Sequence, residues 1–361
     1  MKFKQALISV HDKTGLEELG TELQNMNISI LSTGGTFKFL NDKAIKCRQL
    51  SEYTDMPEIL EGRVKTLHPK VFGGILFKRD VASHVQDISK NNIESIDIVV
   101  VNLYPFASVI KREHTFEEAV ENIDIGGVSL IRAAAKNHKF TLIIVDPTDY
   151  TKLINQLKSG DVTEQFKKEL SIKAFRQTSE YDNIIGSYLG KDDKPMEYVT
   201  LSLKKKQDLR YGENPHQSAT LCKISGSDNG ITNANILSGK ELSYNNIVDL
   251  DSAHRAVADF KDPTCVIVKH NNPCGVSSNP DLSRATANAI AADSESAYGG
   301  IIALNTMVDE KTAKIIASKD NFFEAIIAPG YEPETTKILT TSTPWGKNLR
   351  ILELSSNFNS L

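Results

Sequence analysis

Residues 61–76 hold several side chains suited to binding an anion or moving a proton. The cations are Arg63, Lys65 and Lys70, and Thr66 and His68 lie among them. Pro69 disfavours a helix through His68, and Gly73-Gly74 lets the backbone turn tightly or approach a ligand. Such a segment is typical of an anion site with a proton donor. For a short basic cluster alone, a solvated loop is the better interpretation, so the rest of the chain has to decide.

A second segment suited to anions is the turn Ser32–Thr36, which reads Ser-Thr-Gly-Gly-Thr. A strand, a turn rich in hydroxyls and glycine and then a helix N-terminus offer free backbone N–H groups and a favourable dipole to a phosphate. The turn has neither the Walker pattern nor the Gly-x-Gly-x-x-Gly pattern. By itself it fits an ordinary tight turn equally well.

Short apolar runs alternate with helical patterns in the first half of the chain. The runs that fit buried parallel strands are 5–10, 28–31, 45–50, 96–102 and 140–145. Helices are expected after an Asp12 cap, from Phe37, after Thr115, over Val128–Asn137, from Pro147 and over about 164–189. This alternation predicts a doubly wound parallel sheet with ligands at the carboxyl ends of its strands. The Ser32–Thr36 turn, Ser9, Tyr104 and Asp124 fall at or just after such ends.

Composition limits the function classes. At 361 residues with 40% hydrophobic residues, the chain has enough apolar content for two cores. A formal net charge of −4 gives no global nucleic-acid footprint. We expect no signal peptide, no membrane span and no metal site. Four cysteines without close spacing indicate reduced thiols, so a cytoplasmic protein is expected.

The second half carries a Lys-His pair at the end of an apolar strand, residues 265–268. Lys269 and His270 together are able to polarise a carbonyl group and shuttle a proton. A structural histidine beside a surface lysine explains an isolated pair better. A zinc deaminase fits poorly, because Pro273-Cys274 lacks a second cysteine three residues later.

Ordered motifs in both halves resemble a known family, the bifunctional AICAR transformylase/IMP cyclohydrolases of purine biosynthesis. The first half contains Ser-Val-His-Asp-Lys-Thr-Gly, Ser-Thr-Gly-Gly-Thr, Glu-Gly-Arg-Val-Lys-Thr-Leu-His-Pro, Asn-Leu-Tyr-Pro-Phe, Ile-Asp-Ile-Gly-Gly and Ala-Ala-Ala-Lys-Asn-His in the family's order. The resemblance implies a methylglyoxal-synthase-like three-layer α/β/α domain with a parallel sheet over 1–190 and a linker over 191–208. Residues 209–361 would form the first part of a cytidine-deaminase-like α/β transformylase domain.

For the first domain, the resemblance implies closure of formyl-AICAR to IMP with loss of water and without a cofactor. It assigns the reacting centre to Lys65, Tyr104, Asp124 and Lys136. It assigns substrate binding to Ser9, Lys13, Thr33, Gly35, Thr36, Arg63, Thr66 and Asn102, and to the backbone N–H groups of Ile125, Gly126 and Gly127. Which group transfers the proton stays open.

For the second domain, the resemblance implies formyl transfer from 10-formyltetrahydrofolate to AICAR. Lys269 and His270 match the family's catalytic pair, and the positions around the nucleotide are Arg210, Tyr211, His216, Asn245 and Tyr298. The family continues well beyond Leu361, so we expect an incomplete transformylase domain, and its activity in this chain stays open. A homodimer is expected, with no nucleic-acid or membrane partner.

Two alternatives from other classes remain. One is a regulatory module that senses a phosphate or nucleotide without turnover, since methylglyoxal-synthase-like domains also bind effectors. The other is a scaffold left after loss of activity. The ordered set of reacting residues favours the enzyme over both.

Overall fold

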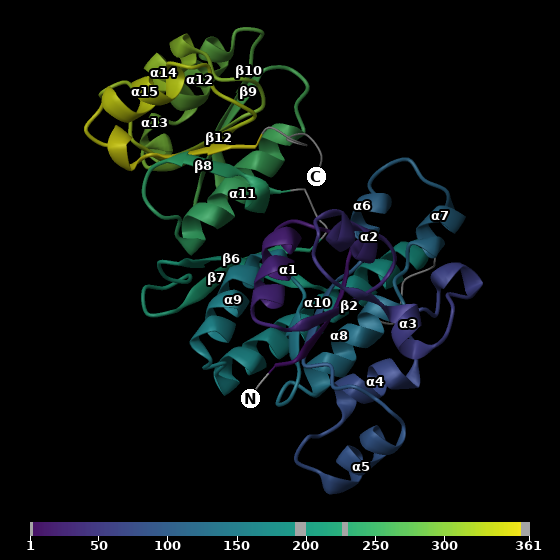
Figure 1. Cartoon of the computed structure of the whole chain (residues 1–361). Helices are drawn as coiled ribbons and strands as arrows, with labels where there is room; N and C mark the ends of the chain where they lie inside the picture. The colour runs from purple at the N-terminus through teal and green to yellow at the C-terminus, as the bar shows by residue number, and fades with distance from the viewer. Residues whose placement is uncertain (1–2, 192–199, 226–229, 355–361) are drawn as a thin grey trace. The chain divides into compact units, whose positions relative to one another are not determined.

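The computed structural model describes residues 3–191, 200–225 and 230–354, and the chain divides into two compact units, Met1–Ser202 and Leu203–Leu361 (Figure 1). Each unit has its own sheet and its own apolar core. Part of the expected 191–208 linker, residues 192–199, lies outside the described residues, and Leu203–Leu209 forms a strand. Within the described ranges, no helix is long and apolar enough to cross a membrane.

The first unit is built on a five-stranded sheet with the order β3-β2-β1-β4-β5, in which every pairing is parallel. Its strands are β1 (Gln5–Val10), β2 (Ser29–Ser32), β3 (Arg48–Gln49), β4 (Ile98–Asn102) and β5 (Leu142–Ile144). Consecutive residues of β1 and β4 are buried although they point to opposite faces, so helices cover both faces of the sheet. The predicted parallel α/β architecture is confirmed.

The helices of this unit connect the strands and form its outer layers. They are α1 (Leu16–Asn25), α2 (Gly34–Asp42), α3 (Leu50–Thr54), η1 (Leu60–Gly62), α4 (Pro69–Leu76), α5 (Ala82–Lys90), α6 (Phe106–Val109), α7 (Phe116–Glu121), α8 (Gly126–Lys136), η2 (Pro147–Asp149), α9 (Tyr150–Ser159) and α10 (Glu164–Leu189). One group packs α1 against α9, and a second packs α8 against α4 and α10.

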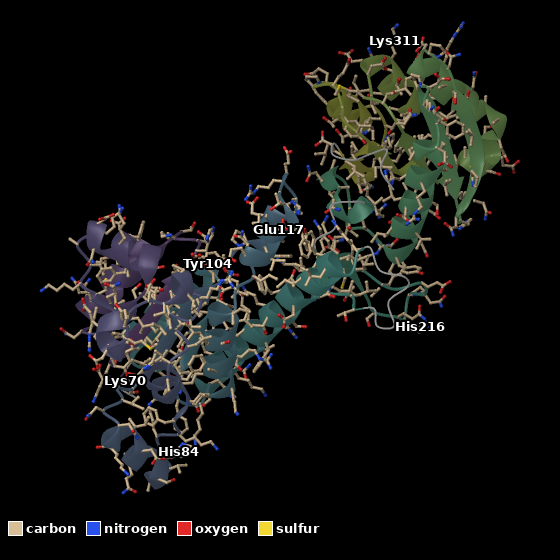
Figure 2. All side chains as sticks on the ribbon, turned by 90° about the vertical axis from the view of Figure 1, so that its right-hand side faces the viewer. Lys70, His84, Tyr104, Glu117, His216 and Lys311 are labelled. Carbon is tan, nitrogen blue, oxygen red and sulfur yellow. The ribbon has the colours of Figure 1, made fainter. Side chains whose placement is uncertain are left out.

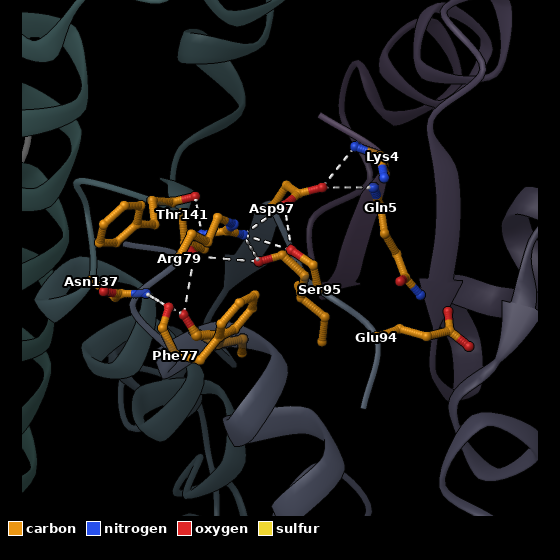
Figure 3. Close-up of polar contacts among 12 residues, drawn as sticks. Lys4, Gln5, Phe77, Arg79, Glu94, Ser95, Asp97, Asn137 and Thr141 are labelled. Carbon is orange, nitrogen blue, oxygen red and sulfur yellow. Dashed lines mark hydrogen bonds and ion pairs between the residues drawn. The ribbon is translucent and has the colours of Figure 1, made fainter. Parts of the chain in front are cut away.

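An ion pair inside a hydrogen-bond network fixes the amino edge of this sheet, where β1, β4 and β5 begin (Figure 3). The Arg79 guanidinium lies 2.6 Å from a carboxylate oxygen of Asp97, whose side chain is only 4% exposed. The same carboxylate accepts hydrogen bonds from the backbone N–H groups of Lys4 and Gln5 at the start of β1. The guanidinium also donates to the carbonyl oxygen of Phe140. This side chain therefore ties together the segments that precede three strands.

Three local predictions for this unit are wrong. The run 45–50 gives a two-residue strand, because Leu50 starts a short helix instead. Asp12 does not cap α1, whose N-cap is Gly15 at φ 70°; its carboxylate accepts from the backbone N–H of Thr14. Gly73-Gly74 makes no turn, because both residues lie inside α4. A Cβ at Gly74 would lie 2.5 Å from the carbonyl oxygen of Glu94, so this glycine lets the helix pack closely.

The second unit has a six-stranded mixed sheet with the order β10-β9-β11-β12-β13-β8 and a separate two-stranded sheet, β6-β7. The strands are β6 (Leu203–Leu209), β7 (Ala219–Ile224), β8 (Asn235–Ser238), β9 (Thr264–Lys269), β10 (Asn272–Ser278), β11 (Gly300–Leu304), β12 (Phe323–Ala328) and β13 (Arg350–Glu353). The helices are η3 (Ile231–Asn233), α11 (Tyr244–Ala258), α12 (Leu282–Ala292), α13 (Ser294–Ala297), α14 (Glu310–Ile316), α15 (Thr335–Thr341) and η4 (Gly346–Asn348).

Candidate active site

A cavity of 630 Å³ opens at the carboxyl edge of the first sheet, the edge opposite the Arg79 network. Five segments line it: the end of β1, the β2–α2 turn, the loop before α4, the end of β4 and the α7–α8 connection. The sequence-predicted residues among its lining are Ser9, Lys13, Thr33, Gly35, Thr36, Arg63, Lys65, Thr66, Asn102, Tyr104, Asp124, Ile125, Gly126 and Gly127. Residues from distant parts of the chain therefore share one cavity, as the parallel topology requires.

One side of the cavity has the features of a phosphate site. Helix α2 begins at Gly34, which has φ +46°, and a Cβ placed on Gly35 would meet no atom within 4 Å. The first N–H groups of a helix have no partner inside it, so those of Gly34 and Gly35 are available to a ligand. A Cβ on Gly34 would lie 3.7 Å from Nζ of Lys65, so a cation stands next to the helix start. Free amides, dipole and cation together suit a dianion.

Hydroxyl groups fix the β1 and β2 ends beneath this site. Ser9 Oγ lies 3.1 Å from Thr33 Oγ1. The Thr36 hydroxyl donates to the carbonyl oxygen of Val10 and accepts from its N–H, so it locks α2 onto β1. The side chain of Asn102, a predicted ligand, binds the neighbouring loop instead. Its amide oxygen accepts from the N–H groups of residues 11 and 12. Asn102 thereby positions the loop that carries Lys13.

The basic cluster of residues 63–70 divides into two parts. Arg63, Lys65 and Thr66 line the cavity. His68 instead caps α4 by accepting from the N–H of Lys70, and the Lys70 ammonium pairs with Asp55 at 2.6 Å. Pro69 therefore begins a helix, and only the part of the segment before it reaches the site.

Arg63 forms an ion pair with Glu121, the last residue of α7, and both residues line the cavity. The pair connects the loop before α4 to the end of α7. That loop is strained, because Leu60 and Glu61 have φ of 51° and 54°, in the left-handed region that non-glycine residues rarely adopt. The expected phosphate ligand Arg63 is thus paired with the carboxylate of another residue in the cavity lining.

Asp124 lies in the α7–α8 connection, the last segment in chain order that lines the cavity. Burial raises its pKa above the ordinary value of 3.8, against the opposing effects of hydrogen bonds from the backbone N–H groups of Gly127 and Tyr104 and of the charge of Lys65. The Gly127 N–H lies 2.6 Å from Asp124 Oδ1. A carboxylate whose pKa is raised is a better proton acceptor at neutral pH than an ordinary one.

Tyr104 and the start of α8 complete this end of the cavity. The Tyr104 side chain is 43% exposed (Figure 2), and its ring lies edge-on to that of His11 with 5.5 Å between centroids. Thr66, which is buried, touches the α-carbon region of Gly126, so the loop of Lys65 packs directly on the first residue of α8. A phenol, an ammonium, a carboxyl and helix-start amides therefore converge here.

Lys136 is the predicted residue that the structure does not bring to this cavity. It is the exposed last residue of α8, whereas Gly126 at the other end lines the cavity. Ten residues of helix separate the two positions by about 15 Å along the axis. In this place the ammonium stabilises the carboxyl end of the α8 dipole.

In the second unit, the predicted residues form two local groups. Lys269 ends β9, and its ammonium donates to the carbonyl oxygen of Tyr298 at 2.7 Å. His270 and Asn271 have φ of 52° and 64°, which makes a two-residue turn into β10. Asp249 of α11 accepts from the backbone N–H groups of both turn residues.

The other group is Arg210 with Tyr211. The Arg210 guanidinium lies 4.9 Å from the centroid of the Tyr211 ring. His216 (Figure 2) and Asn245 are exposed, and in the described part of the chain neither bonds to either group.

Sequence reasoning missed three residues that shape these sites. Glu121 pairs with Arg63, Asp249 braces the His270 turn, and the hydroxyl of Tyr181 accepts from the N–H of Asp124. Tyr181 falls on the buried face of α10, where the pattern predicts only core packing. Its one signal is chemical, since a buried tyrosine hydroxyl needs a hydrogen-bond partner.

The parallel sheet with a cavity at its carboxyl edge makes the first unit an α/β domain of the architecture expected from the sequence. Residues 15–129 match the sequence model of the MGS-like domain, and residues 134–360 match that of the AICARFT/IMPCHase bienzyme. The chain belongs to the AICARFT/IMPCHase bienzyme family. The family predicted from the ordered motifs is thereby confirmed. Membership of this family does not favour the alternative of a regulatory module without turnover.

Two curated relatives carry the name bifunctional purine biosynthesis protein PurH. The one from Acetivibrio thermocellus is 49% identical over 358 residues, which cover 97% of this chain and 68% of its own length. The one from Bacillus subtilis is 47% identical over 359 residues, covering 98% and 69%. A solved structure described as that of ForH covers 53% of this chain and 99% of its own, with 29% identity and a TM-score of 0.47.

Proposed function

We propose that the first unit closes formyl-AICAR to IMP and that the second belongs to the machinery that formylates AICAR. The observation that carries the cyclohydrolase proposal is one cavity with two ends. A phosphate cradle at the start of α2 lies at one end, and Tyr104, Asp124 and the start of α8 lie at the other. A phosphorylated nucleotide whose base must exchange protons fits both ends at once.

Ring closure needs a nitrogen nucleophile, an electrophilic carbon and a route for water to leave. The carboxamide nitrogen loses one proton and forms a bond to the formyl carbon, and the formyl oxygen gains a proton and becomes a hydroxyl. The carbon–oxygen bond then breaks, the formamide nitrogen gives up its proton and forms the ring double bond to that carbon, and the hydroxyl leaves as water with a second proton. Asp124 accepts the proton of the attacking nitrogen, because burial has made its carboxylate a stronger base. The Tyr104 phenol donates to the formyl oxygen and so stabilises the charge that develops on it.

The substrate is held at both ends in this proposal. Its phosphate binds the free amides of α2 and the cations Lys13 and Lys65. Its carboxamide oxygen accepts from the N–H groups of Ile125 and Gly126 at the start of α8. Arg63 reaches the phosphate only when it leaves Glu121. Lys136 has no part in this scheme, because about 15 Å of helix separates it from the cavity.

For the second unit we propose formyl transfer to AICAR with 10-formyltetrahydrofolate as co-substrate. The support is the family and the Lys269–His270 hairpin, which presents an ammonium and an imidazole at a strand end. The neighbouring nucleotide contacts would be Arg210, Tyr211, His216, Asn245 and Tyr298. The homodimer and the cytoplasmic location expected from the sequence stay predictions.

The test incubates the purified chain with formyl-AICAR, without folate, and follows IMP formation by ultraviolet absorbance. We expect turnover by the wild-type chain and its loss in Asp124→Ala and Lys65→Ala. His270→Ala is the matched control, because the second unit takes no part in ring closure, and it should turn over normally. Binding of formyl-AICAR without turnover by the wild-type chain would contradict the proposal.

A further inference from the structure

Tyr181 of α10 holds together the two segments that carry the proposed proton-transfer groups. Its hydroxyl accepts from the backbone N–H of Asp124 at 2.8 Å and donates to the carbonyl oxygen of Asn122 at 3.3 Å. Its ring packs edge-on to Phe106, with 6.4 Å between centroids, and Phe106 starts α6 two residues after Tyr104. One side chain therefore contacts both loops.

We infer that Tyr181 is a positioning residue for ring closure, which sets the Asp124 carboxyl against Tyr104 through the Asp124 backbone. The inference rests on the proposed function. Tyr181 is only 8% exposed, so water does not replace its hydroxyl when that group is removed. The Asp124 carboxylate accepts hydrogen bonds from the backbone N–H groups of Tyr104 on one loop and Gly127 on α8. A shift of one segment against the other therefore changes the hydrogen bonds of this carboxylate.

A merely structural role predicts a different outcome from a positioning role. Loss of the Tyr181 hydroxyl leaves the Asp124 N–H without its acceptor and loosens the carboxylate from its own donors. Because those donors lower the carboxyl pKa against burial, their loss raises it further. The phosphate end of the cavity, formed by α2 and Lys65, does not contact Tyr181.

Few charged or titratable groups surround this carboxyl, so few side chains are able to cause a pH effect. Lys65 approaches from the loop before α4 and favours the ionised form. Tyr104 and Tyr181 are the adjacent phenols, and burial raises the pKa of Tyr181 to about 12. Asp182 acts on Tyr181, and Glu121 on the cavity wall is paired with Arg63. Of the two carboxyl groups that act on Tyr181, that of Asp124 belongs to the residue from whose backbone N–H the Tyr181 hydroxyl accepts.

The test compares Tyr181→Phe with Tyr188→Phe in the full-length chain, with formyl-AICAR as substrate. Tyr188 is the matched control: it lies on the same helix and packs on Phe106, but its hydroxyl contacts His114 instead of Asp124. For Tyr181→Phe we expect kcat to fall about 10- to 100-fold, as for a misplaced reacting group, with KM within about twofold. The acid limb of the kcat profile should move up by about one pH unit.

Several outcomes would overturn the inference. Equal kcat values and pH profiles in the two variants would show that the hydroxyl positions nothing. Loss of the fold in Tyr181→Phe alone, seen in its melting curve, would show a structural role. If the wild-type chain does not turn over at all, the proposed function fails and Tyr181 loses its role with it. Turnover by the wild-type chain with an undiminished Tyr181→Phe variant would refute the positioning role alone.

Discussion

Replacing Gly126 with alanine tests whether the Lys65 loop and α8 form one packed unit. In an exposed helix, alanine in place of glycine stabilises by up to about 1 kcal/mol. Here the added methyl group would overlap the hydroxyl oxygen of Thr66, which is 4% exposed. Overpacking of this kind costs about 1–3 kcal/mol, so the expected change has the opposite sign.

The assay is equilibrium unfolding of a double-mutant cycle. Gly126→Ala should lower the free energy of unfolding of the first unit by about 2 kcal/mol. The second substitution, Thr66→Ala, removes the clashing oxygen but keeps the Thr66 β-carbon, which would lie 3.8 Å from the new methyl group. The double variant should therefore recover most of the loss, with a coupling energy of about 1–2 kcal/mol. Additive effects, or a more stable Gly126→Ala variant, would refute this packing between Thr66 and α8.

Three further predictions concern other parts of the chain. Arg79→Met should lower the free energy of unfolding by about 3–5 kcal/mol, because it leaves Asp97 buried without its partner, while kcat per folded molecule stays unchanged. Asp124→Asn should stabilise the fold more at pH 7 than at pH 4. The folded pKa of the Asp124 carboxyl is raised, so the contribution of this group to wild-type stability is fully present below about pH 4 and is lost as the pH rises through the folded pKa. Unfolding curves at the two pH values measure this difference, and equal differences would contradict the sign. Asp249→Ala should speed amide hydrogen exchange at His270, because it removes the acceptor of the turn's N–H groups, and unchanged protection would contradict it.

The sequence was sufficient to predict the parallel sheet and the turns at its carboxyl edge. Period, turn residues and caps are local signals: Thr115 caps α7 as predicted, and α8 begins at Gly126, two residues before the expected start at Val128. A parallel sheet then brings the strand ends together whatever the loops between them do. This rule accounts for Ser9, the Ser32–Thr36 turn, Tyr104 and Asp124 in the cavity lining, whereas Arg63 and Thr66 were expected there from the family resemblance.

Other features depend on geometry that no local pattern contains. Asn102 has the right chemistry for a ligand, yet its amide bonds the adjacent loop. Tyr181 lies more than fifty residues from Asp124 in the sequence, and its spacing on α10 is that of any core residue. Each of these depends on which tertiary partner a polar group finds, which periodicity does not encode.

Because the loop before α4 is strained, the carboxyl edge of the first sheet opens locally more often than the amino edge. Left-handed residues such as Leu60 and Glu61 cost about 1–3 kcal/mol each, so the loop lies closer in free energy to its open forms than the strands do. Buried core strands such as β1 and β4 typically open with free energies near that of global unfolding. A nucleotide that bridges Lys65 and α2 therefore slows the fast local openings of the carboxyl edge, while the amino edge keeps its own rate.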